Sequence, residues 1–334
     1  MGVSASKETE AVAFEGKRSS TLTGHKDAIK CIAFSPDKKL LASGSADGEI
    51  IVWDLKSLRP RYRIQKHDGD VTGVSFSPDS STLLSSGRDK RVVLSDGKTG
   101  ETLQKARGHH GPIMHCAFSP DDNRLYATAS EDKTVGLWQI REGKMEKKEL
   151  KRHSDVVFQV CFSPDRIVLA SCSNDRRILL WNRTSGKIVG KMRDGLSRVL
   201  TCQFSSDGSL IAAVLDGQRV RIWSSITMTV VNVLEGHHTQ PIMCCAYASD
   251  GATLVTGSGD STYALWNTRE ASPAPLYHSK AHDSCVQCVT FSPDGRTLAT
   301  ASDDQQIHLW TPLIACLSCQ ITVVELYNHL ILNK

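Results

Sequence analysis

The stretch Gly24–Asp54, GHKDAIKCIAFSPDKKLLASGSADGEIIVWD, decides the fold of this chain. It begins with Gly-His and ends with Trp-Asp. Between them lie an apolar run ending at Phe34, a Ser-Pro-Asp turn, a second apolar run and the turn Ser45–Gly48. Proline presets φ early in a turn and aspartate caps its own backbone, so this pattern predicts a β-hairpin. The flanking runs predict strands of five to seven residues.

Variants of this stretch recur through the 334-residue chain. The closing position steps by 42 to 44 residues and is occupied by Trp53, Ser95, Trp138, Trp181, Trp223, Trp266 and Trp310. The Ser-Pro-Asp turn recurs at 35–37, 77–79, 119–121, 163–165 and 292–294, with looser copies at 205–207 and 248–250. A fixed period of this size indicates a repeat architecture.

These residues resemble the WD-repeat (beta-transducin-like) family, whose repeat runs from Gly-His to Trp-Asp. The resemblance covers residues 21–311. It implies an all-β fold, a seven-bladed β-propeller of four-stranded antiparallel blades around a channel. The last repeat ends at its third strand, 306–310, whereas an extra strand at 20–23 precedes the first repeat. We therefore expect the N-terminal strand to complete the last blade, which leaves no free edge.

The domain organisation follows from these repeats. We expect a flexible arm at 1–19, a propeller at 20–311 and an apolar tail at 312–334. The repeats close at about residues 54, 96, 139, 182, 224, 267 and 311.

The resemblance also implies a hydrogen-bonded tetrad of His, Ser or Thr, Asp and Trp inside each blade. Such a network pairs buried polar groups and fixes the hairpin turns. Complete sets in blades one, four and seven are His25, Ser43, Asp47, Trp53; His153, Ser171, Asp175, Trp181; and His282, Thr300, Asp304, Trp310. Blades three and six each carry a doubled histidine and leave two candidates open: His109 or His110 with Thr128, Asp132 and Trp138, and His237 or His238 with Thr256, Asp260 and Trp266.

Two blades depart from the pattern. Blade two keeps His67, Ser85 and Asp89, but Ser95 replaces its tryptophan. Blade five keeps only its tryptophan, because the other positions carry Gly195, Ala213 and an aspartate one place early, Asp216. We expect blade five to be the least rigid.

The composition excludes several functional classes. A net charge of +4 is too small to indicate nucleic-acid binding. Eleven cysteines without a secretory signal indicate free thiols in a cytoplasmic or nuclear chain. The regular His-to-Asp spacing is explained by the tetrads, and the Cys285/Cys288 pair lies along a strand, where such residues face opposite sides. We therefore expect no catalytic residue, no cofactor and no metal.

The two ends leave alternatives open. Gly2 and Ser6 fit the N-myristoylation pattern, and the same residues also fit a disordered polar arm. One acyl chain would give only weak, reversible membrane association. The stretch 313–332 is largely apolar, yet polar residues such as Glu325 interrupt it as a membrane span. We favour a tail that packs on the propeller, or an alternative ending that packs poorly.

The resemblance places the partner-binding surface on the narrow face of the propeller. Its positions carry apolar residues in blades three to six: Met114, Val156, Phe158, Leu200, Leu215 and Met243. Polar positions on the same face are Arg88, Glu131, Asn174, Arg198 and Asp303. Large apolar groups at a surface mark interaction sites, so we expect a peptide or helix to dock with Phe158 as anchor. The alternative is that these side chains only line the channel wall.

The chain is therefore expected to be a non-enzymatic, monomeric scaffold that binds proteins or peptides in a multiprotein complex. An alternative is a substrate receptor of a cullin-RING ubiquitin ligase, whose family members carry Trp-Asp-x-Arg. Here Trp138–Arg141 and Trp266–Arg269 keep the arginine and lack the aspartate.

Overall fold

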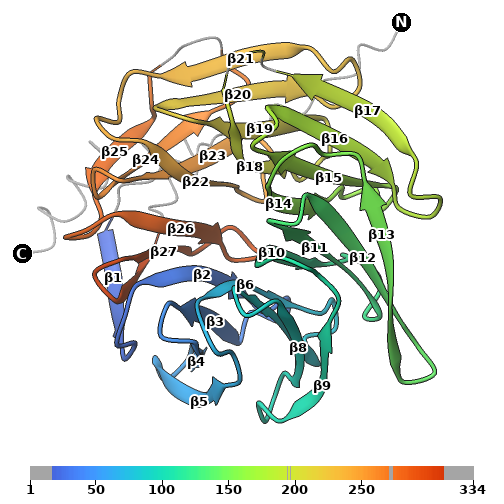
Figure 1. The fold of residues 1–334 in the computed structure, drawn as a ribbon. Helices are drawn as coiled ribbons and strands as arrows, with labels where there is room; N and C mark the ends of the chain where they lie inside the picture. The colour runs from blue at the N-terminus through green and yellow to red at the C-terminus, as the bar shows by residue number, and fades with distance from the viewer. Residues whose placement is uncertain (1–16, 194, 196, 271–273, 312–334) are drawn as a thin grey trace, which may run out of the picture.

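The protein is a closed seven-bladed propeller (Figure 1). The structure, a computed structural model, describes residues 17–193, 195, 197–270 and 274–311. These residues form 28 strands in seven four-stranded antiparallel sheets. Gly2 and the tail 312–334 lie outside the described residues. The predicted all-β propeller is confirmed.

Each blade runs outward from the channel in chain order. The inner strands are β2 (Ile29–Phe34), β6 (Val71–Phe76), β10 (Ile113–Phe118), β14 (Val157–Phe162), β18 (Val199–Phe204), β22 (Ile242–Tyr247) and β26 (Val286–Phe291). The second strands are β3 (Leu40–Ser45), β7 (Thr82–Gly87), β11 (Leu125–Ser130), β15 (Val168–Ser173), β19 (Leu210–Leu215), β23 (Thr253–Ser258) and β27 (Leu298–Ser302). The third strands are β4 (Glu49–Asp54), β8 (Arg91–Asp96), β12 (Thr134–Arg141), β16 (Arg177–Asn182), β20 (Arg219–Ser224), β24 (Thr262–Asn267) and β28 (Gln306–Thr311). The outer strands are β5 (Arg59–Gln65), β9 (Thr102–Arg107), β13 (Lys144–Lys151), β17 (Ile188–Arg193), β21 (Val230–Glu235), β25 (Tyr277–Lys280) and, for blade seven, β1 (Lys17–Thr23).

The ring closes through its N-terminal strand. β1 pairs antiparallel with β28, from Thr23 opposite Gln306 to Lys17 opposite Thr311. This strand begins three residues earlier than the sequence pattern predicted. Its pairing covers the edge that the last repeat would otherwise expose, which confirms the predicted closure.

The Ser-Pro-Asp turns join the inner and second strands by one recurrent set of bonds. In blade one Ser35 Oγ donates to Asp37 Oδ1 over 2.6 Å and accepts from the backbone N–H of Leu40 over 2.9 Å. The residue after the aspartate is left-handed in every blade except blade three, as at Lys38 with φ 62°. The hydroxyl and carboxylate therefore satisfy the turn backbone, which explains why this tripeptide punctuates the repeat.

The second strands are almost fully buried because neighbouring blades cover both of their faces. All six residues of β3 are buried. A Cβ on Gly44 would lie 2.5 Å from the Val71 side chain of the next blade.

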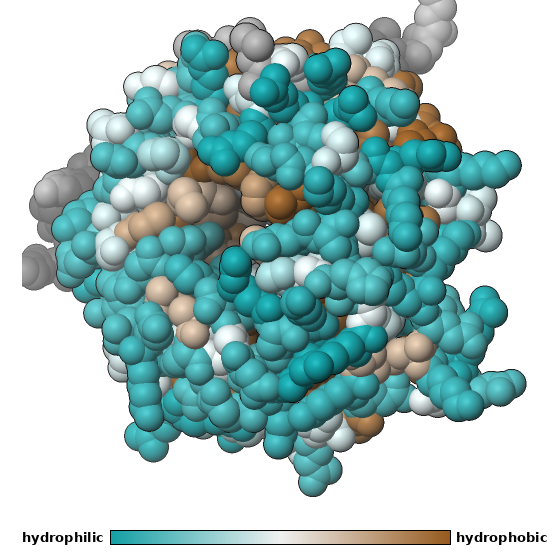
Figure 2. All heavy atoms as spheres, in the orientation of Figure 1, coloured by the Kyte–Doolittle hydropathy of each residue, from teal (hydrophilic) through white to brown (hydrophobic). Residues whose placement is uncertain are grey.

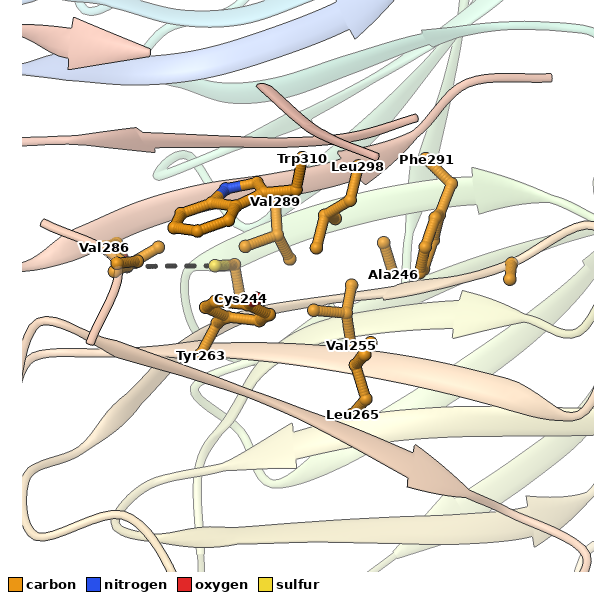
Figure 3. Packing of buried hydrophobic residues seen from close by; sticks show 12 residues of the cluster. Cys244, Ala246, Val255, Tyr263, Leu265, Val286, Val289, Phe291, Leu298 and Trp310 are labelled. Carbon is orange, nitrogen blue, oxygen red and sulfur yellow. Dashed lines mark hydrogen bonds between the residues drawn. The ribbon is translucent and has the colours of Figure 1, made fainter. Parts of the chain in front are cut away.

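The core consists of apolar clusters at the blade interfaces. Figure 3 shows the cluster between blades six and seven, where Cys244 and Tyr263 meet Val289 and Trp310. The ring centroids of Tyr263 and Trp310 are 5.0 Å apart. Burial of such surface stabilises the ring by about 25 cal/mol per Å².

Candidate functional site

A four-membered polar network is complete in blades three, four and seven. In blade four His153 Nε2 lies 2.7 Å from Ser171 Oγ, and His153 Nδ1 lies 2.8 Å from Asp175 Oδ2. Trp181 Nε1 donates to the same Ser171 Oγ over 2.8 Å. Blade seven repeats this geometry at 2.8, 2.9 and 3.0 Å with His282, Thr300, Asp304 and Trp310. The network joins the Gly-His loop, the second strand, its turn and the third strand.

The structure selects one histidine in each doubled pair. His109 contacts Thr128 Oγ1 over 2.7 Å and Asp132 over 2.8 Å, while the neighbouring His110 is exposed. In blade six His238 contacts Thr256 Oγ1 over 2.8 Å. The other member, His237, is exposed, with its ring 5.6 Å from that of Trp266.

Blade one carries all four residue types but not all the bonds. His25 Nε2 lies 2.7 Å from Ser43 Oγ, and Trp53 Nε1 donates to that oxygen over 2.9 Å. His25 Nδ1 is 3.9 Å from Asp47 Oδ2 and makes no hydrogen bond. The sequence does not reveal this longer distance between histidine and aspartate, because the residue types match those of blade four.

Blades two and five lack network members, as their sequences show. In blade two His67 contacts Ser85 and Asp89, and Ser95 is buried where an indole would lie. In blade five Trp223 Nε1 is buried without a hydrogen-bond partner. Asp216 accepts instead from Arg198 over 2.9 Å.

Electrostatics favour a neutral imidazole at His282 and an ionised carboxylate at Asp132. Burial lowers the pKa of His282 despite the charge of Asp304. Burial alone would raise the pKa of Asp132, but hydrogen bonds from His109 and Thr134 outweigh it and hold that pKa well below its ordinary value. The complete networks in blades three, four and seven pair their polar groups with one another inside each blade, so these networks serve structure.

The central channel forms a cavity among the described residues. It encloses about 690 Å³ and is lined by the inner strands. Four predicted partner-binding residues line it: Met114, Phe158, Leu200 and Met243. Figure 2 shows the central hollow, with apolar surface gathered over β18 and β22. Met243 is 36% exposed, so this apolar surface reaches solvent.

Two other predicted apolar contacts lie elsewhere. Leu215 is 1% exposed, because β19 pairs it with Val199 and its side chain enters the core between blades four and five. It therefore contributes to packing and not to a contact surface. Val156 is partly buried and does not line the channel.

The polar residues that were predicted to bind a partner form ion pairs or hydrogen bonds, either within one blade or between neighbouring blades. Lys30 Nζ contacts Asp303 over 2.9 Å, and Arg88 contacts Glu131 over 3.1 Å. Both pairs join neighbouring blades. Asn174 Nδ2 donates to Asp155 over 2.6 Å, whereas Asn174 Oδ1 has no hydrogen-bond partner.

Sequence reasoning missed His115, which lines the channel from β10. Its Nδ1 makes no hydrogen bond, and burial lowers its pKa to about 4. The third position of the inner strands has no common residue type, so the repeat pattern does not mark this histidine as a channel residue. That position carries Cys31, Gly73, His115, Gln159, Thr201, Cys244 and Cys288. Within the described residues, no helix has the length and apolarity to cross a membrane.

Known proteins share the repeat. Seven segments match the WD domain, G-beta repeat: residues 16–54, 58–96, 100–139, 144–182, 186–224, 228–267 and 274–311. An uncharacterised WD repeat-containing protein of Schizosaccharomyces pombe is 28% identical over 254 residues, 74% of this chain and 56% of that protein.

Other relatives match over single short stretches. A Notchless protein homolog of Arabidopsis thaliana is 48% identical over 44 residues, 13% of this chain and 9% of that protein. The DDB1- and CUL4-associated factor 13 of Xenopus tropicalis is 41% identical over 54 residues, 16% of this chain and 12% of that protein. These alignments thus span a small part of each relative.

Proposed function

Because the chain belongs to the WD40 family of G-beta-repeat propellers, we propose that it is a non-enzymatic scaffold that binds another protein at its channel mouth. Propellers of this family are generally non-enzymatic scaffolds that bind other proteins. One observation carries the proposal: Met114, Phe158, Leu200 and Met243 each contribute a large apolar side chain to the channel lining, one from each of blades three to six. Apolar residues of this kind are enriched in the cores of interfaces.

The surroundings of this lining suit a peptide or helix with an apolar side chain. A volume of about 690 Å³ accommodates several inserted side chains. Phe158 is partly buried against the core of blades four and five, so its ring is held in place before a partner arrives. The Lys30–Asp303 and Arg88–Glu131 pairs offer both signs of charge for orienting the partner.

The test is a comparison of substitutions inside and outside the channel. Met243→Asp should remove the proteins that co-purify with the chain, as measured by quantitative mass spectrometry. Ile226→Asp is the matched control, because Ile226 is 81% exposed on the outer turn before β21. Retention of every partner by a correctly folded Met243→Asp variant would contradict the proposal.

A second candidate is a receptor for a ubiquitin-ligase adaptor. It is favoured by the short similarity to a relative named as DDB1- and CUL4-associated. The Arg141 side chain is 69% exposed at the end of β12 and lies 3.9 Å from Glu146, whereas Arg269 pairs with Asp207 over 2.9 Å. Arg141→Ala should then abolish co-purification of the adaptor, while Arg124→Ala should not.

A further inference from the structure

The outer strand of blade six brings a second histidine to that blade's network. β25 has four residues, and its register places His278 opposite Ala264 of β24. The rings of His278 and His238 are 5.6 Å apart between centroids. One ligand atom from each of His238, Asp260 and His278 lies within 4.8 Å of the other two. Figure 1 shows β25 beside β24 at the rim of the propeller.

The His-to-Asp contact in this blade differs from that in its neighbours. In blades two, three, four and seven, histidine Nδ1 lies between 2.8 and 3.1 Å from an aspartate oxygen. In blade six His238 Nδ1 lies 3.5 Å from Asp260 Oδ2. His238 Nδ1 contacts Thr262 Oγ1 over 2.9 Å instead, and His278 Nε2 contacts the same hydroxyl over 3.1 Å.

We propose that His238, Asp260 and His278 bind a zinc ion. Two imidazoles and one carboxylate are a zinc donor set. The Thr262 hydroxyl, which contacts both imidazoles and donates to Asp260 Oδ1, is the nearest protein oxygen for the fourth position. Ligand bonds of about 2.0–2.1 Å around a tetrahedral ion put neighbouring ligand atoms about 3.4 Å apart. The 3.5 Å between His238 Nδ1 and Asp260 Oδ2 fits that separation. A histidine and an aspartate that are hydrogen-bonded at 2.8 Å, as in blade four, lie too close together to be neighbouring ligands of the ion.

The second shell suits the metal-bound state. Metal on His238 Nδ1 leaves the imidazole proton on Nε2, which lies 2.8 Å from Thr256 Oγ1. The Thr256 hydroxyl oxygen accepts hydrogen bonds from that Nε2–H and from the Trp266 indole N–H, and the hydroxyl donates to the Ala264 carbonyl over 3.4 Å. A ligating histidine is held in this way when its other nitrogen donates to the protein. Binding releases any proton carried by Nδ1 and involves no redox step.

Blade one offers a weaker alternative. His25, Asp47 and Glu49 also have ligand atoms within 4.8 Å of one another. Glu49, however, already pairs with Arg63 over 2.7 Å, and the guanidinium charge opposes a cation there. Blade one also supplies one imidazole instead of two. Zinc in blade six would tie the four-residue strand β25 to the Gly-His loop, which gives the site a structural role.

The experiment uses the full chain without a polyhistidine tag, stripped of metal by a chelator. Calorimetric titration with Zn²⁺ should show one bound equivalent. Co²⁺ should give the visible absorption of a tetrahedral nitrogen and oxygen site. His278→Ala should weaken Zn²⁺ binding by at least about tenfold. This variant keeps the tetrad, and its exposed position allows the fold to remain intact.

His237→Ala is the matched control, because His237 is exposed beside the site and is not one of the three ligands. It should retain wild-type affinity and the thermal shift produced by Zn²⁺. Mg²⁺ should produce no shift, because it prefers oxygen ligands. Three results would overturn the proposal: no stoichiometric binding by the wild type, equal binding by His278→Ala, or the thiolate charge-transfer bands of a cysteine site.

Discussion

Blade four contains the complete polar network, whereas blade five buries its tryptophan without that network. Trp181 and Trp223 are both buried, at 2% and 6% exposure. The Trp181 indole donates to Ser171, whereas the Trp223 indole has no partner, because Ala213 stands at the equivalent position. Both blades nevertheless have the same four strands. The comparison teaches that apolar packing and strand pairing form a blade, and that the tetrad is a separate addition.

Blade five compensates through its apolar surroundings. Ala213 is fully buried in the cluster that joins blades four and five, together with Ile211. The opposite cluster joins Val214 to blade six. At the histidine position, Gly195 has φ 91°, a conformation in which any side chain would be strained. The blade thus avoids most of the buried polar groups but retains one unpaired indole N–H.

The largest expected effect is the loss of the network in blade four. His153→Ala should lower the free energy of unfolding by about 2–4 kcal/mol, because Ser171 and Asp175 lose their partner in a buried site. Thermal unfolding followed by circular dichroism measures this. In blade five, where glycine replaces the histidine, Asp216→Ala removes only an exposed pair with Arg198 and should cost no more than about 0.5 kcal/mol. Equal losses in the two blades would remove the distinction between them.

The second effect is local opening. Amides in the hairpins of blade five should exchange with deuterium at least about tenfold faster than those of blade four, because most of the network bonds are absent. Hydrogen exchange with mass spectrometry on the intact chain resolves the two sets of peptides. Equal protection of β14–β16 and β18–β20 would show that apolar packing alone sets the rigidity.

The fold could be predicted from the sequence because each repeat contains the residues that form its own turns and strands. The Ser-Pro-Asp tripeptide predicts bonds that the structure shows at Ser35 and Asp37, and the period places every strand. The closing strand was predictable because the last repeat lacks a fourth strand. The start of β1 at Lys17 was not, because strand pairing with β28, and not local propensity, extends it.

The site was only partly predictable, because side-chain positions depend on register and on neighbouring blades. The channel residues Phe158 and Met243 follow from the family pattern, whereas Leu215 turns into the core. The choice of His109 over His110 depends on which ring reaches Thr128. The approach of His278 to its network depends on the pairing of β24 with β25, which no local pattern encodes.

The third effect is acid sensitivity. Burial alone would raise the pKa of Asp175, but the hydrogen bond from His153 outweighs it and keeps that pKa below its ordinary value. A lowered folded-state pKa gives stability that is present above the unfolded-state pKa of about 3.9 and is lost as the pH falls through the folded-state value. Asp175→Asn should therefore lose less stability than the wild type between pH 5 and pH 3, roughly. Melting temperatures across this range measure the difference, and parallel curves would contradict it.

The smallest expected effect is an increase in stability, obtained by restoring one hydrogen bond of the network in blade five. Ala213→Ser places a hydroxyl opposite Arg221 on β20, at the position from which Ser171 accepts the indole N–H in blade four. The unpaired Trp223 Nε1 should then donate to it, which should stabilise the chain by about 1 kcal/mol in thermal unfolding. Ala213→Ser combined with Trp223→Phe is the control, because no indole N–H remains to be paired. An equal gain in that double variant would assign the effect to packing, and a loss in the single variant would show that blade five has no room for the bond.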